Sequence, residues 1–377
     1  MASRPQKVVI IIPTYNESLT IEKTLSELQK VISSIANFDI HVLVFDSAST
    51  DNTQKLVNKF MANNSNIHLL TEKSKTGLGS AYMQAMRYAL SDMQADLIFE
   101  FDADLSHQPK YIEPMLLQTK NNDVVIGSRY VPGGSIPKEW SFDRKFLSVI
   151  GNFIARFMLT RKYKDFTSGF RVTKSSLLKQ SLPQSFLSNQ YAYKIQLLWL
   201  LHKAKAKIYE YPIEFIDRQK GQSKLPTNSI YDTLKVLFVL RLHELKGYLK
   251  MCLVGLSGLV IQLFIYNLLR QYLTPFYAQQ IAVTVAILNN YLLNSRFTFK
   301  SKISISRLNK IKSLILFIGY SLLMIGLQTY WLDFGIKYLG DGSLKENLII
   351  ISGMFLGSLL NYLIYSRLIW RKKFLDS

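Results

Sequence analysis

With 377 residues, the chain is long enough for two domains with full-sized cores. Its formal charge is +20, yet no nucleic-acid-binding motif accompanies this charge, so we expect no nucleic-acid partner. The single cysteine, Cys252, excludes an intrachain disulfide and a cysteine-based zinc site. The apolar run at residues 8–12 is too short for the core of a signal peptide, so we expect the first part of the chain in the cytoplasm.

Short apolar runs alternate with amphipathic stretches in the first part of the chain. The runs are typical of strands buried on both faces of a parallel sheet, and they occupy residues 8–12, 40–45, 67–70 and 97–99. The stretches that follow the first three runs repeat apolar residues at helical spacing. This alternation predicts a doubly wound, Rossmann-like α/β domain.

Polar residues and glycines follow the predicted strands, at the sheet edge where such domains bind their ligands. Tyr15 is suited to contact a base or a ribose, and Glu17 and Asp46 can accept hydrogen bonds from either. Gly77 and Gly79 let the backbone approach a ligand closely, although the entry to a helix explains these glycines equally well. We therefore predict a nucleotide site at this edge.

Two carboxylates, Asp102 and Asp104, follow the fourth predicted strand. On extended backbone they point to the same side and can share one hard cation, whose other ligands are phosphate oxygens and water. A divalent ion that bridges a diphosphate is the natural occupant. An isolated Asp-x-Asp also commonly caps a loop, so the motif alone leaves both interpretations open.

An ordered series of motifs resembles the family 2 glycosyltransferases, and among them the dolichol-phosphate mannose synthase type. The motifs lie at residues 13–17, 46–51, 77–81, 102–109, 127–130, 144–148, 167–171 and 217–224, so the resemblance covers about residues 7–225. It implies a GT-A fold, a nucleoside-diphosphate sugar donor, Mg²⁺ or Mn²⁺, and a polyprenyl phosphate acceptor. Donor-binding residues implied by the match are Pro13, Tyr15, Glu17, Asp46, Gly77, Gly79, Asp102 and Ala103.

The resemblance also assigns roles in the reaction. A phosphate monoester acceptor is already an anion at neutral pH, so its attack on the sugar needs no strong general base. The reaction does need a metal for the leaving diphosphate and cations for the acceptor phosphate. We expect Asp104 to be the principal metal ligand, with Asp102 binding the metal or the ribose. Asp104, Arg129 and Arg218 are the expected catalytic residues. The expected acceptor-phosphate site comprises Arg129, Arg144, Ser148, Arg218 and Lys224.

The sugar is indicated by the residues after the carboxylate pair. Ser106 and His107 resemble the mannose-type enzymes, which favours transfer of mannose from GDP-mannose, with inversion, to a dolichyl-type phosphate. Where the family usually has paired aspartates, this chain has Asp46 and Ser47, which leaves base recognition open. The alternative enzyme is a UDP-glucose-dependent polyprenyl-phosphate glucosyltransferase. We expect His107 to be a loop residue, and Gln196 has no assigned role.

The last third of the chain contains four apolar stretches of nearly membrane-spanning length, at residues 251–269, 271–295, 313–332 and 347–366. They predict an integral membrane protein with an all-α domain of four transmembrane helices. This part resembles the GtrA-like membrane domain over about residues 247–371. We expect a catalytic domain at residues 1–227, an interfacial helix at 228–246, and the transmembrane domain at 247–377.

Basic residues flank these stretches at residues 296–312 and 367–373. By the positive-inside rule, both segments face the cytoplasm, which also places both termini and the catalytic domain there. Residues 142–157 and 229–245 mix aromatic and aliphatic residues with basic ones, as interfacial helices do; a core-facing helix explains the first equally well. A lipid-linked-sugar flippase with an accessory glycosyltransferase domain is the rival function. The sequence leaves open assembly into a homo-oligomer.

Overall fold

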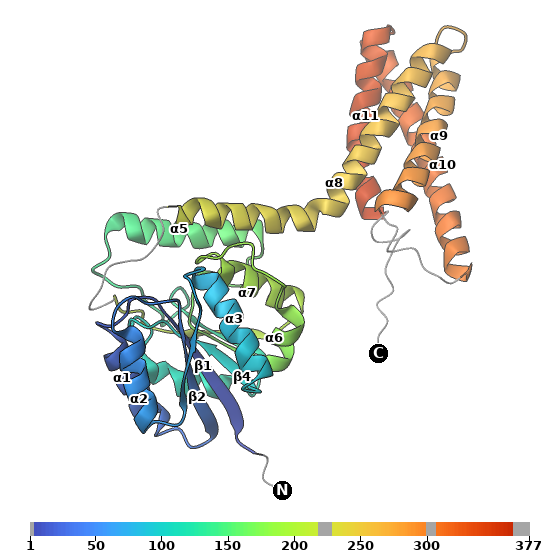
Figure 1. The fold of residues 1–377 in the computed structure, drawn as a ribbon. Helices are drawn as coiled ribbons and strands as arrows, with labels where there is room; N and C mark the ends of the chain where they lie inside the picture. Colours follow the sequence, from blue (N-terminus) through green and yellow to red (C-terminus); the bar gives the residue numbers. More distant parts are fainter. Residues whose placement is uncertain (1–3, 218–227, 299–306, 365–377) are drawn as a thin grey trace. The chain divides into compact units, whose positions relative to one another are not determined.

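The computed structural model describes residues 4–217, 228–298 and 307–364. The chain divides into two compact units, Met1–Arg241 and Leu242–Ser377. The first unit is an α/β domain and the second is a helical bundle (Figure 1).

The first unit is built on a seven-stranded mixed sheet with the order β3-β2-β1-β4-β6-β5-β7. The first four strands pair in parallel, as predicted, whereas β6 runs antiparallel to both β4 and β5. In chain order the strands are β1 (Gln6–Thr14), β2 (Phe38–Asp46), β3 (Ile67–Thr71), β4 (Leu97–Glu100), β5 (Val124–Ser128), β6 (Arg171–Lys174) and β7 (Ile208–Pro212).

Helices cover both faces of the sheet (Figure 1). Val8 and Ile10 of β1 belong to a core with α1, α2 and α4, and Val9 and Ile11 belong to a second core with α3 and α7. This alternation buries β1 on both sides, which explains its continuous apolar run. The helices of this unit are α1 (Ile21–Ile32), α2 (Thr53–Asn63), α3 (Leu78–Ser91), the 3₁₀ turn η1 (Pro109–Tyr111), α4 (Ile112–Gln118), α5 (Phe142–Met158), α6 (Ser175–Ser181) and α7 (Tyr193–Lys203).

The register of the parallel strands brings their carboxyl ends to one edge. Thr14 at the end of β1 is paired with Asp46 at the end of β2, and Ile11 is paired with Glu100 at the end of β4. The segments that follow these three strands therefore emerge side by side. This edge is where the sequence predicts a nucleotide site.

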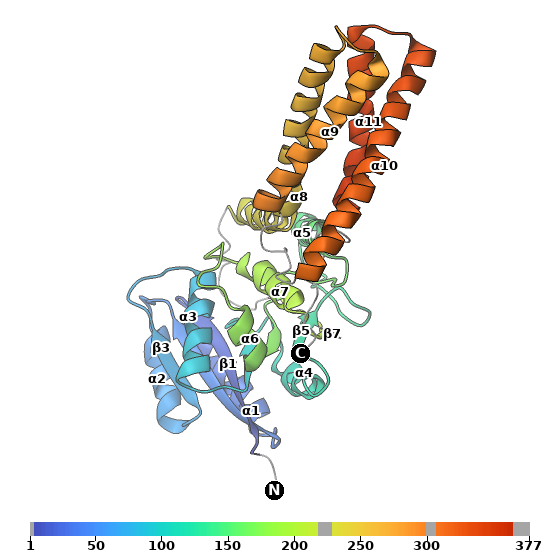
Figure 2. The same ribbon diagram turned by 90° about the vertical axis from the view of Figure 1, so that its right-hand side faces the viewer.

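Helix α8 (Ser229–Leu269) begins in the first unit and continues into the second. The second unit further contains α9 (Pro275–Leu293), the π-helical turn η2 (Asn294–Thr298), α10 (Arg307–Leu339) and α11 (Ser343–Ile364), which lie side by side with the later part of α8 (Figure 2). Among the residues that the structure describes, two segments, Leu249–Leu269 and Ile315–Leu339, are long and apolar enough to cross a membrane, with mean hydropathies of 2.0 and 1.5. Helix α9 begins at Pro275, later than the predicted residue 271, because proline suits the first helical turn.

Polar side chains connect the helices of the bundle. Gln262 on α8 donates a hydrogen bond to Gln328 on α10, with 3.2 Å between nitrogen and oxygen. Tyr266 donates to Glu346 of α11 at 2.6 Å. Such bonds between helices are the common use of polar groups in an apolar bundle.

Candidate active site

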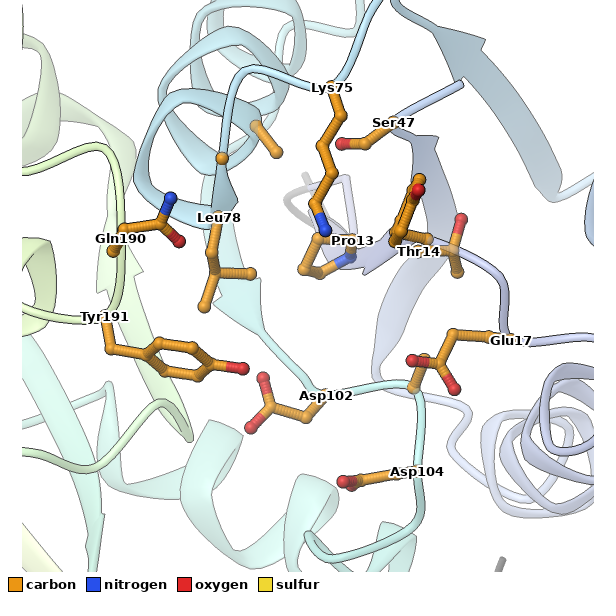
Figure 3. Close-up of a pocket in the computed structure, with 14 residues that line it drawn as sticks. Pro13, Thr14, Glu17, Ser47, Lys75, Leu78, Asp102, Asp104, Gln190 and Tyr191 are labelled. Atoms are coloured by element: carbon orange, nitrogen blue, oxygen red, sulfur yellow. The ribbon is translucent and has the colours of Figure 1, made fainter. Parts of the chain in front are cut away.

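A cavity of about 130 Å³ opens at the carboxyl edge of the sheet (Figure 3). Its 14 lining residues come from the end of β1, from the segments after β1, β2, β3 and β4, from the start of α3 and from the segment before α7. Six of the eight predicted donor-binding residues line it, together with the predicted metal ligand Asp104: Pro13, Tyr15, Glu17, Gly77, Asp102 and Ala103. The structure therefore brings together most of the predicted donor site.

Hydrogen bonds of the loop hold the carboxylate pair in place. The β4 ladder extends by one bond, from the Phe101 N–H to the carbonyl of Ile11 at 3.0 Å. The Thr24 hydroxyl of α1 donates to the carbonyl of Ala103 at 2.7 Å, and the Ser106 N–H donates to Asp104 Oδ1 at 3.0 Å. The loop between Asp102 and Asp104 is thus anchored from α1 and from its own backbone.

The oxygen donors at this position fit a hard divalent cation. Asp102, Asp104 and Glu17 all line the cavity, with the Asp102 carboxylate directed toward Tyr191 and Glu17 on the opposite side (Figure 3). Within residues 4–217, 228–298 and 307–364, no group of three His, Cys, Asp or Glu side chains is arranged to hold a metal by itself. An ion bound by these carboxylates would take further oxygens from substrate phosphates and water, which is how Mg²⁺ is usually held beside phosphates.

Asp46 lies behind the cavity wall instead of lining it. Its buried carboxylate accepts hydrogen bonds from Thr14 Oγ1 at 2.9 Å, from the Ser49 N–H at 2.9 Å and from Gln54 Nε2 at 2.6 Å. With its oxygens engaged by the protein, Asp46 orients the loop after β2. Its neighbour Ser47 is the residue of this loop that lines the cavity.

The two predicted glycines have a structural explanation. Gly77 has φ +111°, a conformation that favours glycine, and a Cβ there would lie 2.4 Å from the carbonyl oxygen of Asn189. A Cβ on Gly79 would lie 2.6 Å from the carbonyl oxygen of Ser188. Both glycines let the start of α3 approach the segment before α7 closely, and Gly77 also lines the cavity.

Arg129 is already paired inside the protein. Its Nε and Nη2 donate to the two carboxylate oxygens of Asp165 at 2.8 and 2.7 Å, and Nη2 also donates to the Thr167 hydroxyl at 2.6 Å. Burial alone would raise the pKa of Asp165, but the charge and hydrogen bonds of Arg129 outweigh burial and hold this pKa below its ordinary value. The guanidinium is therefore fixed in one orientation.

The other predicted acceptor residues that the structure describes lie on or near α5. Arg144 Nη1 pairs with Asp217 at 3.0 Å and stacks 4.1 Å above the Trp140 ring. The Ser148 and Tyr130 hydroxyls form a hydrogen bond at 2.7 Å. The remaining two, Arg218 and Lys224, lie outside the described residues.

Aromatic rings join the carboxylate pair to these cations. His107 Nδ1 lies 3.6 Å from Asp102 Oδ2, and the imidazole contacts the Phe215 ring with 5.4 Å between centroids. Phe215 in turn contacts Trp140 at 5.7 Å, and Trp140 lies beneath Arg144. Burial lowers the pKa of His107 to about 4, so the ring is neutral at physiological pH and acts as part of this aromatic wall. The predicted metal ligands and acceptor cations thus belong to one cluster.

Several site residues were not predicted. Ser47, Lys75, Leu78, Gln190 and Tyr191 also line the cavity. Lys75 Nζ lies 3.6 Å from the centroid of the Tyr15 ring. Gln196, which had no assigned role, is buried and accepts a hydrogen bond from the Leu187 N–H at 2.7 Å. It therefore anchors the segment before α7, part of which lines the cavity.

Comparison with known proteins agrees with this arrangement. Residues 9–182 match the model of glycosyl transferase family 2, and residues 250–370 match that of the GtrA/DPMS transmembrane domain. The dolichol-phosphate mannosyltransferase of Pyrococcus furiosus is 30% identical over 359 residues, covering 88% of this chain and 97% of the relative. The undecaprenyl-phosphate mannosyltransferase of Micrococcus luteus is 34% identical over 219 residues, covering 58% of this chain and 87% of the relative.

Among solved structures, glucosyl-3-phosphoglycerate synthase from Mycobacterium tuberculosis in complex with Mn²⁺ and UDP aligns at 18% identity and a TM-score of 0.44, covering 63% of this chain and 80% of that one. The match to glycosyl transferase family 2, together with the mixed seven-stranded sheet, identifies the first unit as a glycosyltransferase domain of the GT-A fold. The chain belongs to glycosyltransferase family 2, and its second unit is a GtrA/DPMS transmembrane domain, which makes it a membrane protein.

Proposed function

We propose that this protein transfers mannose from GDP-mannose to a polyprenyl phosphate of the dolichyl type, with inversion, at the cytoplasmic face of the membrane. The observation that carries the proposal is the single cluster that joins Asp102 and Asp104, through His107 and an aromatic wall, to the acceptor cations. The names of the relatives from Micrococcus luteus and Pyrococcus furiosus support a mannosyl donor and a polyprenyl phosphate acceptor.

On the donor side, the chain binds and orients the nucleotide sugar. A divalent ion, Mg²⁺ or Mn²⁺, held by Asp104 and Asp102 would supply the charge that stabilises the leaving diphosphate. The bonds from Thr24 and Ser106 keep the loop of these carboxylates in place before substrate arrives. Such preorganisation lowers the cost of reaching the transition state, because the charged groups need not rearrange.

On the acceptor side, the phosphate monoester brings its own negative charge, so its attack needs orientation more than deprotonation. Asp165 holds the Arg129 guanidinium in one orientation, so this cation would be in place before the acceptor phosphate binds. Arg144 is more exposed and can exchange its partner Asp217 for a phosphate. Ser148 is a further candidate for this phosphate, and the resemblance adds Arg218 and Lys224.

Helix α5 supports a lipid acceptor. Its exposed residues include Phe142, Phe146, Phe153 and Phe157, next to Arg144 and Lys145. The first part of α8 lies beside α5 and exposes Tyr231 and Phe238 (Figures 1 and 2). Exposed aromatic residues mixed with basic ones are typical of helices that lie in the membrane interface. This surface would bring a membrane-bound phosphate to the cations of the site.

The test is a transfer assay with the purified full-length protein in liposomes that contain a polyprenyl phosphate. Labelled GDP-mannose and UDP-glucose are supplied outside, with Mg²⁺ or Mn²⁺. We expect label from GDP-mannose in the lipid fraction, released by mild acid as mannose. Label from UDP-glucose alone would favour the glucosyltransferase alternative. Movement of a preformed lipid-linked sugar across the bilayer, with no transfer from either donor, would favour a flippase.

A further inference from the structure

Lys194 is a buried cation next to the carboxylate pair. It is the second residue of α7, its side chain is only 7% exposed, and its Nζ lies 3.8 Å from Asp102 Oδ2. Lysine is almost never this buried unless it has a partner of opposite charge. Within the described structure, the partner beside this ammonium group is a carboxylate of the donor site.

Both ends of Lys194 are held in place. Its backbone carbonyl accepts a hydrogen bond from Arg171 Nη1 at 3.4 Å, and Arg171 is itself paired with Glu100. At the other end, a Cβ added to Gly169 would lie 2.1 Å from Lys194 Nζ. Glycine at position 169 therefore leaves the space that the ammonium group occupies.

The position of Lys194 changes the charge balance of the donor site. A divalent ion between Asp102 and Asp104 would be neutralised by these two carboxylates alone. With the Lys194 ammonium 3.8 Å from Asp102, the same assembly carries a net charge of about +1, which favours an anionic diphosphate and disfavours the ion by itself.

We propose that Lys194 makes metal binding depend on the donor: it offsets the charge of Asp102, so that a divalent ion binds tightly only together with a nucleoside diphosphate. The inference rests on the proposed function, because it takes the carboxylate pair as the metal site. Lys194 is a positioning residue in this scheme. It also keeps Asp102 paired while the site holds no donor.

The test compares Lys194→Met, which removes the charge at similar length, with Lys194→Arg, which keeps it. Lys203→Met is the matched control, because it removes one positive charge at the other end of α7, about 13 Å along the helix axis. Each full-length variant is titrated with Mn²⁺ in detergent, and free Mn²⁺ is followed by electron paramagnetic resonance. The titrations are run alone, with GDP and with UDP.

We expect Lys194→Met to bind Mn²⁺ without nucleotide about tenfold more tightly than the wild type. The enhancement of Mn²⁺ binding by the nucleotide should fall by a similar factor. Lys194→Arg and Lys203→Met should behave as the wild type. Unchanged or weaker Mn²⁺ binding by a folded Lys194→Met would overturn the inference while leaving the metal site standing. A wild type that binds no Mn²⁺ even with nucleotide would overturn the metal site itself.

A second variant covers the case in which Lys194→Met fails to fold. In Gly169→Ala the new methyl group occupies the position of the ammonium group, whose flexible chain must turn away from Asp102. This variant should also bind Mn²⁺ more tightly without nucleotide. Its folding is checked by gel filtration and thermal unfolding, and Mn²⁺ binding equal to the wild type would contradict the inference.

Discussion

Arg171 and Glu100 form a bidentate ion pair across the antiparallel strands β6 and β4, directly behind the carboxylate pair. Arg171 Nη2 lies 2.8 Å from both oxygens of Glu100, and the two side chains are 1% and 2% exposed. Their register positions face each other. The pair holds the end of β4, from which the loop with Asp102 emerges, and it also reaches the backbone of Lys194.

Breaking this pair should destabilise the first unit strongly. Arg171→Met leaves the Glu100 carboxylate buried without its counterion, at a cost on the order of 3–5 kcal/mol, or a fall in melting temperature of roughly 10 °C. The double variant Glu100→Leu/Arg171→Met should recover much of this loss, because no isolated charge remains. Thermal unfolding of the full-length protein in detergent measures both; a single variant as stable as the wild type would show that the pair is not needed.

Asp104→Asn should abolish transfer while leaving the fold intact. The amide keeps an oxygen that can accept from the Ser106 N–H, now at 3.0 Å from Asp104 Oδ1, but it loses the negative charge that a metal requires. We expect kcat to fall by roughly 10²-fold or more, with an unchanged melting temperature. Formation of lipid-linked product at the wild-type rate would remove Asp104 from the reaction.

Substitution of Thr24 should weaken the anchoring of the loop at residues 102–104 without changing any residue of the loop itself. Thr24→Val removes the buried hydroxyl that donates to the Ala103 carbonyl at 2.7 Å, at a cost of about 1–3 kcal/mol. The less ordered loop should also raise KM for GDP-mannose. Thr24→Ser keeps the hydroxyl and serves as the control. Equal donor KM values for the two variants would mean that the loop is held mainly by other contacts.

The His41 and His68 pair gives the fold a dependence on pH. Their ring nitrogens are 3.0 Å apart, and burial, followed by the nearby His41 and Lys7, lowers the pKa of His68. Because the unfolded chain binds this proton at about pH 6.5 and the folded chain binds it only at lower pH, stability is complete above about pH 6.5 and is lost as the pH falls below it. His68→Gln should therefore lose less stability between pH 7.5 and 5.5 than the wild type.

Melting temperatures measured across this pH range provide the check. His243→Gln is the control, because His243 is exposed. A His68→Gln variant with the same pH profile as the wild type would assign the acid sensitivity to other groups.

The exposed aromatic residues of α5 should act on the lipid substrate and not on the donor. Phe146 and Phe153 are 52% and 62% exposed. The double variant Phe146→Gln/Phe153→Gln should raise KM for a long-chain polyprenyl phosphate by about thirtyfold or more, since each phenylalanine contributes on the order of 1–2 kcal/mol when it is buried in lipid. KM for GDP-mannose should not change. Leu19→Gln, at another exposed apolar position, is the control.

The sequence predicts the parts of the fold that depend on local pattern. The apolar runs of β1 to β4 were found because both faces of each strand are buried. The antiparallel strand β6 was not predicted, because Arg171–Lys174 mixes charged and apolar residues. Its arginine is buried only because Glu100 lies opposite, and a contact between residues so far apart in the chain leaves no local signal.

In the candidate site, too, the residues that follow a local pattern were predicted, and those that depend on contacts distant in the chain were not. Tyr15, Glu17, Asp102 and Asp104 could be predicted because strand order brings strand ends together. Asp46 was predicted as a contact to the nucleotide, but hydrogen bonds from Thr14 and other tertiary neighbours place it behind the wall. Lys75, Gln190 and Tyr191 lie in loops without a motif. They line the cavity only because the segment before α7 packs against the start of α3 in the folded chain, and the sequence carries no local signal of this contact.

The close contact between the start of α3 and the segment before α7 limits which residues can change the nucleotide preference of the site. At Gly77 the wall of the cavity is bare backbone, held so close to Asn189 that no side chain can be added. Mutation therefore cannot tune recognition along this stretch, in a laboratory or in evolution. A change of nucleobase would have to come from lining residues that carry side chains, such as Ser47, Lys75 or Gln190.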